Sequence, residues 1–221
     1  MARPLTYKEL EKSNIATEKE LLQLKQHMDL LQTSLTATER HFHTHEAVIE
    51  CVDLLLRQEK FIDIAHDIYS KCKRILDAKA GYVALIDQSG KYLDVLYLDT
   101  GGLQCTVNSE SSMPIRGLRK ETLQKKTTLC CNNFNRSKWL KFLPRGHVTL
   151  QNVLFAPIMI EQIPVGLLGF ANKSKDFDHD DIRIASSFAQ LAALALSNSK
   201  AWQVMKRKPG RHKKTERYIT A

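Results

Sequence analysis

The sequence predicts an α+β fold, an antiparallel sheet of about six strands with helices on one face, preceded by a coiled-coil helix. Three observations predict it. A heptad pattern runs through the N-terminal part, two later segments have the period of two that is typical of hairpin strands, and apolar residues at helical spacing flank these hairpins. A chain of 221 residues is long enough for one domain of about 150 residues with accessory helices.

Residues 10–45 are expected to form the coiled-coil helix, after a disordered start at residues 1–9. No Gly or Pro occurs between Leu10 and Phe42, and apolar residues follow one another at alternating steps of three and four. This seam favours a parallel homodimer, and the alternative is a single amphipathic helix folded onto the domain. The seam consists of Leu21, Leu24, Met28, Leu31 and Leu35.

Residues 46–202 are expected to form the domain itself. Helical spacing predicts two helices within 46–77, and Gly90 supplies the turn of a first hairpin. A loop-rich part, residues 99–149, leads to a second hairpin, and Asp178 with Asp181 predicts a capping box at the start of a long final helix. The strands and the short helix between them are expected at 82–86, 92–98, 118–124, 127–131, 152–160 and 165–172.

The composition excludes several classes of protein. With 43% hydrophobic residues, 9 Gly and 6 Pro, the chain is neither collagenous nor broadly disordered. The formal charge of +9 lies mostly in residues 203–221, which hold seven basic residues against Glu216 and are expected to form a basic flexible tail. The sequence therefore predicts that the body of the protein does not bind nucleic acid.

The cysteines and the hydropathy favour a cytoplasmic protein. Five cysteines are an odd number, they form no CxxC pair, and no secretory leader precedes them. The most apolar stretch, residues 153–171, is interrupted by Glu161, Gln162 and Pro164, so two buried strands around a turn explain it better than a membrane span. No transmembrane segment is expected.

The second hairpin and the helix after it resemble a known family. The sequence NVLFAPIMIEQIPVGLLGFANKSKDFDHDD is similar to the second half of a GAF domain, the small sensory module of prokaryotic signalling proteins, and the resemblance covers about residues 46–200. It implies an antiparallel sheet, a small-ligand pocket under the 99–149 loops, and a dimer formed through the flanking helices. It also implies a role in intracellular signal transduction beside a protein such as a histidine kinase in a two-component system.

A short motif closes the hairpin. Some GAF domains that bind cyclic nucleotides carry a five-element signature, and its first four elements match Asn172, Lys173, Phe177 and Asp181. Ile182 replaces the final Glu. Because the Lys and Asp of such a motif can pair across the loop between strand and helix, we expect a structural role for these four residues.

The pocket is expected to be built from Trp139, Phe142 and His147, with Cys130 and Cys131 nearby. Two alternatives stay open. In the first, the two aromatic residues pack a covering segment and the imidazole caps a strand. In the second, His147 is the axial ligand of haem, as in some GAF domains of redox- or gas-sensing kinases. No other metal site is expected, since His41, His43 and His45 lack a carboxylate on their helix face.

No catalytic motif is present, so the chain is expected not to be an enzyme. GAF-fold reductases of free methionine sulfoxide resemble one another in a reactive Cys in the loop shortly before the strand that corresponds to residues 152–160, and that loop here, residues 143–151, has none. The sequence therefore predicts a sensory module whose ligand shifts the packing of paired helices. The alternatives are a haem-dependent sensor using His147 and a ligand-free dimerisation scaffold.

Overall fold

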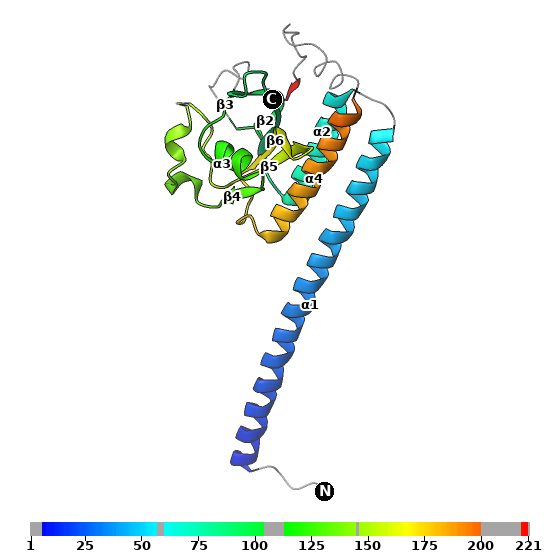
Figure 1. Cartoon of the computed structure of the whole chain (residues 1–221). Coiled ribbons are helices and arrows are strands. Elements are labelled where there is room, and N and C mark those ends of the chain that lie inside the picture. Colours follow the sequence, from blue (N-terminus) through cyan, green and yellow to red (C-terminus); the bar gives the residue numbers. More distant parts are fainter. Residues whose placement is uncertain (1–5, 57–59, 104–112, 145, 200–217, 221) are drawn as a thin grey trace. The chain divides into compact units, whose positions relative to one another are not determined.

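The computed structural model describes residues 6–56, 60–103, 113–144, 146–199 and 218–220 (Figure 1). The chain divides into two compact units, residues 1–45 and residues 46–221, and each is described by itself. The first unit is helical, and the second contains the sheet.

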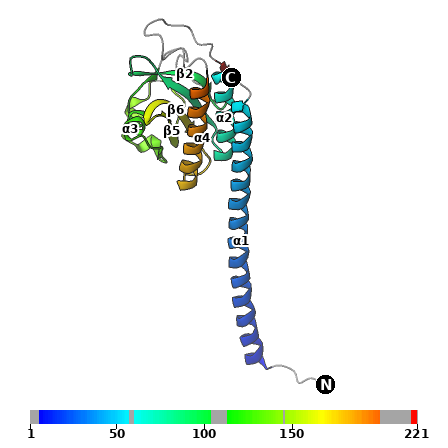
Figure 2. The same cartoon turned by 45° about the vertical axis from the view of Figure 1, so that its right-hand side comes forward.

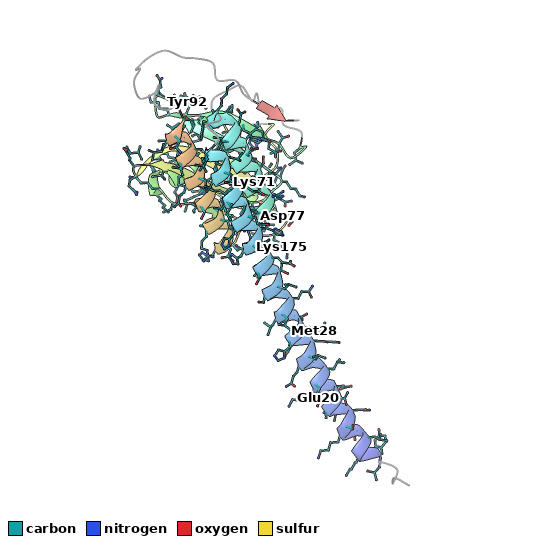
Figure 3. All side chains as sticks on the ribbon, turned by 90° about the vertical axis from the view of Figure 1, so that its right-hand side faces the viewer. Glu20, Met28, Lys71, Asp77, Tyr92 and Lys175 are labelled. Atoms are coloured by element: carbon teal, nitrogen blue, oxygen red, sulfur yellow. The ribbon has the colours of Figure 1, made fainter. Side chains whose placement is uncertain are left out.

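Helix α1, Tyr7–Leu56, contains no Gly or Pro to interrupt it. It begins at Tyr7 rather than at residue 10, and its last turns replace the first of the two helices expected within 46–77. Several threonine hydroxyls of the first unit, including those of Thr17 and Thr33, donate hydrogen bonds to carbonyls four residues earlier. Figure 3 shows Glu20 and Met28 standing away from the helix axis.

The second unit is built on an antiparallel sheet, as the sequence predicts, and its strands follow the order β3-β2-β1-β6-β5-β4. Neighbours along this path are antiparallel. The strands are β1 Ala80–Ile86, β2 Tyr92–Asp99, β3 Met113–Pro114, β4 Leu129–Cys131, β5 Val153–Ile160 and β6 Ile163–Ala171. A short strand β7, Tyr218–Thr220, pairs in parallel with β2, so this part of the expected flexible tail is a strand. The rest of the tail lies outside the described residues.

Two turns fix the hairpins. Between β1 and β2, the Asp87 carboxylate accepts the backbone N–H groups of Lys91 and Tyr92 at 3.1 and 3.0 Å, and Gly90 has a positive φ of 69°. Between β5 and β6, both Glu161 and Gln162 have positive φ, as a two-residue hairpin turn requires. This tight turn lets β6 begin at Ile163, two residues before the expected start.

Helices α2, Phe61–Leu76, and α4, His179–Asn198, lie side by side on one face of the sheet (Figure 2). The last turns of α1 pack into the same core through buried residues such as Cys51. Tyr69 stacks on Phe170 with 5.3 Å between ring centroids, and Phe188 and Leu154 are fully buried beside them. This is the helical face that the sequence predicts.

The opposite face is covered by shorter elements. These are α3, Leu118–Lys125, and two 3-10 turns, η1 Phe134–Arg136 and η2 Leu140–Phe142. They enclose a second apolar layer that includes Tyr82, Phe155 and Leu167. Gly169 makes room for the Tyr82 ring, since a Cβ there would lie 2.7 Å from its Cε1. The sheet is therefore buried on both faces, and α3 is the helix that lies opposite α2 and α4.

Candidate functional site

The layer beneath α3 contains a buried polar group, the hydroxyl of Tyr82. The side chain is 9% exposed, and its hydroxyl has no hydrogen-bond partner of normal geometry among the described residues. Burial raises the pKa of this phenol, and the Arg119 guanidinium acts in the opposite direction. The two groups are therefore close without forming an aligned hydrogen bond. Such an incompletely satisfied polar pair in an apolar layer is a candidate site for a polar ligand.

Arg119 lies on α3 and is half-buried. Its Nη1 atom lies 3.0 Å from the sulfur of Met113, which is a weak acceptor. A guanidinium carries five N–H donors in a planar fork that matches a carboxylate or a phosphate. Most of these donors have no acceptor among the described residues, so they are available to a ligand.

Trp139 and Phe142 lie together, as the sequence predicts. Their ring centroids are 6.3 Å apart at 33°, and both rings are half-buried. Trp139 packs at the edge of the layer that contains Tyr82. Phe142 lies on Gly117, where a Cβ would be 2.9 Å from the ring. The absence of a side chain at Gly117 thus lets the 3-10 turn η2 close against the start of α3.

His147 is half-buried, and its Nδ1 atom lies 2.9 Å from the carbonyl oxygen of Val148. That hydrogen bond requires the proton on Nδ1 and leaves Nε2 as a lone-pair donor. Among the described residues, no ring contact joins His147 to Trp139 or Phe142. The structure brings the two aromatic rings together but does not add the imidazole to them.

Cys130 and Cys131 lie on opposite faces of β4, because successive side chains of a strand alternate. Cys130 packs against the core under α2 and α4, where burial raises the pKa of its thiol. Cys131 packs against the layer beneath α3. Of this pair, only Cys131 lies on the face of the sheet that α3 covers.

The motif Asn172-Lys173-Phe177-Asp181 holds the connection between β6 and α4. The Lys173 ammonium lies 2.5 Å from the Asp181 carboxylate, which is fully buried. The same oxygen of Asp181 accepts the N–H of Asp178, and Asp178 accepts the N–H of Asp181, so the expected capping box is present. Lys173 also lies 5.8 Å from the Phe177 ring centroid. These contacts account for a structural role without a ligand.

Two asparagines that the sequence reasoning missed stabilise the same connection. Asn152 donates to the carbonyls of Lys173 and Lys175 and accepts the N–H of Lys173. Asn132 pairs with both backbone groups of Phe177, at 2.8 and 3.0 Å. Each forms its bonds with residues at least 21 positions away, so no local pattern identifies it.

The apolar seam of α1 is a second candidate surface. Its residues Leu21, Leu24, Met28, Leu31 and Leu35 are all between 51% and 68% exposed within their unit. The heptad count continues into the second unit, where Ile49, Val52 and Leu56 are 63%, 41% and 74% exposed. Other residues of the same turns, Ala47, Cys51 and Leu55, are buried in the core. The last turns of α1 therefore present an inner and an outer apolar stripe.

A charged hollow of about 600 Å³ separates the end of α1 from α2. Its lining mixes both signs of charge, and the ion pair between Lys71 and Glu50 crosses it and lowers the pKa of Glu50. The lining therefore includes an ion pair of its own, between Lys71 and Glu50. No cluster of three or more metal-binding side chains occurs in the described part of the chain. No helix in those residues combines the length and the apolar character that crossing a membrane requires.

The sheet buried on both faces, with α2 and α4 on one side and α3 on the other, defines a small α+β module. A family model for the GAF domain matches residues 60–197, and the chain belongs to this family. The resemblance seen in the second hairpin is thereby confirmed.

Solved structures with the same fold come from several kinds of protein. The GAF domain of a phosphoenolpyruvate-protein phosphotransferase from Coxiella burnetii has a TM-score of 0.62 at 12% identity, covering 74% of this chain and 98% of that one. The corresponding Acinetobacter domain gives 0.60 at 15%, covering 71% and 93%. Free methionine-R-sulfoxide reductase from Neisseria meningitidis, solved with its substrate, gives 0.57 at 13%, covering 72% and 90%. A search of the curated proteins found no match.

Proposed function

We propose that this chain is a non-enzymatic sensory module of cytoplasmic signal transduction. It binds a small ligand under the 99–149 loops, forms a homodimer through α1, and passes a change in packing to a partner such as a histidine kinase. The observation that carries the proposal is the pair of Tyr82 and Arg119, an unsatisfied hydroxyl and an underused guanidinium in the layer between sheet and α3.

The proposal assigns binding rather than chemistry to this layer. Cys131 is the thiol on this face of β4, and it packs against the apolar layer. A reactive thiol needs a neighbouring base or positive group that lowers its pKa. The reductase among the structural relatives therefore supports the fold of this chain and not its activity.

The exposed seam of α1 supports the homodimer. Apolar side chains that remain more than half exposed along several turns are covered by a partner helix in coiled-coil proteins. In a parallel dimer, Glu20 would face Lys25 of the second copy at the flanking heptad positions, and the symmetric pair would form as well. This charge pattern favours the parallel orientation.

The inner stripe on the last turns of α1 can transmit a change in packing from the domain to the helix. Ala47 and Cys51 are buried against the helical face of the sheet, so a shift of α2 or α4 changes the packing of α1. A ligand that binds one packing more tightly than another shifts the population towards it. The signal would then be a change between two arrangements of the paired helices.

The haem-dependent sensor using His147 is the second candidate, and the free Nε2 atom of that imidazole is what favours it. The described residues fit haem poorly, because Leu118, Leu123 and Phe134 fill the layer beneath α3 and are at most 6% exposed. The ligand-free dimerisation scaffold is the third candidate and predicts no bound molecule at all.

The test begins with native mass spectrometry and an absorption spectrum of the purified protein. We expect a small molecule that is released from the Arg119→Gln variant, with the circular dichroism spectrum unchanged. A visible haem band that disappears in His147→Ala would replace the proposal by the haem sensor. If the protein is a dimer without any bound molecule and shows no thermal shift in a metabolite screen, the result would favour the ligand-free dimerisation scaffold.

A further inference from the structure

The positive charge of the folded domain is concentrated in one segment. Residues 113–149 contain nine basic residues and a single acidic one, Glu121. The formal net charge of this segment is +8, close to that of the whole chain. The structure places the described part of this segment along α3, β4, η1 and η2. The net charge of residues 1–202 is only +3, because acidic residues in the other segments offset the +8 of this one.

We call the exposed basic residues of this segment the basic face. Its members are the exposed side chains Arg116, Lys120, Lys126, Arg136, Lys138 and Lys141. The segment with α3 and the segment with η1 and η2 are in contact, because Phe142 packs on Gly117 and the charge of Lys138 acts on Glu121. Figure 1 shows α3 and the green loops after it on the same side of the sheet.

The charges of the basic face are not neutralised within the described structure. Glu121 is already paired with Lys125 at 2.6 Å, and none of the six members has an acidic partner among the described residues. Lys138 and Lys141 instead lie over aromatic rings, 4.4 Å from the Trp139 centroid and 5.3 Å from that of Phe142. The ammonium groups of these two exposed lysines therefore lie over two half-buried rings.

Apolar side chains lie among these charges. Leu140 occupies the 3-10 turn η2 between the two lysines and is 43% exposed. Cations beside an exposed aliphatic side chain and partly exposed aromatic rings suit the boundary between lipid headgroups and acyl chains. Recognition of bases in nucleic acids uses free aromatic faces for stacking or an element that enters a groove, and here lysines lie over the rings.

We propose that the basic face docks on an anionic lipid bilayer, with Leu140 inserting between headgroups. This interaction is peripheral and needs no membrane-spanning helix. Each basic residue near an anionic membrane surface strengthens binding about fivefold, and the attraction decays over a Debye length of about 8 Å at physiological salt. Binding therefore depends on anionic lipid and weakens as salt is raised.

The experiment measures sedimentation of the full chain with vesicles of phosphatidylcholine, with and without phosphatidylserine. We expect binding only to vesicles with phosphatidylserine, and a loss of at least about 25-fold in Lys138→Glu/Lys141→Glu, since two lysines are removed. Leu140→Ser should also weaken binding while its dependence on salt stays the same. The C-terminal tail is identical in all variants, so differences between them report on the basic face.

The matched control is Lys60→Glu/Arg74→Glu, an equal change of charge at exposed positions beside and on α2, which covers the opposite face of the sheet. This control should bind as the wild type does. Equal binding by the control and by Lys138→Glu/Lys141→Glu would overturn the proposal, as would binding to neither kind of vesicle. Tighter binding to double-stranded DNA than to vesicles, with no effect of Leu140→Ser, would replace the lipid by nucleic acid.

Discussion

The buried ion pair between Lys173 and Asp181 permits a quantitative prediction. Asp181→Asn keeps the side-chain volume and an oxygen that can accept the N–H of Asp178, but it removes the negative charge beside Lys173. Lys173 is 10% exposed in its side chain, so its ammonium stays largely desolvated without a counter-charge. Breaking a buried pair in this way costs about 3–5 kcal/mol in unfolding free energy. We expect the lower end, because the slight exposure of Lys173 admits some solvation.

The assay is urea unfolding followed by circular dichroism, and two controls separate the causes. Asp178→Ala removes the side-chain acceptor of the capping box, keeps the pair of Lys173 and Asp181, and should cost about 1 kcal/mol. Lys173→Met/Asp181→Leu removes both charges and should recover most of the stability lost in Asp181→Asn. The reasoning is refuted if Asp181→Asn costs no more than Asp178→Ala, or if the double variant is less stable than Asp181→Asn.

Three further predictions concern the helix, the thiols and the imidazole. Leu24→Asp/Leu31→Asp places charge in the exposed seam and should convert the dimer to monomer in light scattering; a wild type that is monomeric at tens of micromolar would contradict the dimer. Burial raises the pKa of the Cys51 thiol to about 11, above the unfolded value of 9.0, so its contribution to stability is full below pH 9 and falls between pH 9 and 11. Cys51→Ala should reduce the fall of the unfolding free energy between pH 9 and 11. Cys131 is partly exposed and should therefore react with a thiol reagent before the buried Cys51 does. His147→Ala should weaken an identified ligand by about 1–3 kcal/mol if the imidazole binds it, whereas a lower melting temperature with unchanged affinity would remove His147 from the site.

Much of the fold could be predicted because the signals are local. The period of two, the turn at Gly90 and the capping box of Asp178 and Asp181 each occupy fewer than ten neighbouring residues, and the structure confirms all three. The opposite orientation of Cys130 and Cys131 follows from strand geometry alone and is also confirmed.

The candidate site was harder to predict because its parts are distant in the sequence. Tyr82 has the alternation of an ordinary strand residue, and only the packing of α3 brings Arg119 beside it, 37 positions later. A count of charge segment by segment could have located the basic face. The net charge of residues 1–202 as a whole concealed it, because acidic residues in the other segments offset the basic ones. The continuation of α1 to Leu56 was missed because the polar His45 interrupts the apolar seam.

The inner and outer apolar stripes on the last turns of α1 limit the insertions that this helix can tolerate. One inserted residue rotates a helix by about 100°, which would carry Ile49 or Val52 out of line with the seam before them while Ala47 and Cys51 stay in the core. Seven inserted residues return the pattern to within about 20°. Natural relatives with the same dimer should therefore differ in the length of this helix by multiples of seven residues, and single-residue insertions should be confined to the loops of the domain.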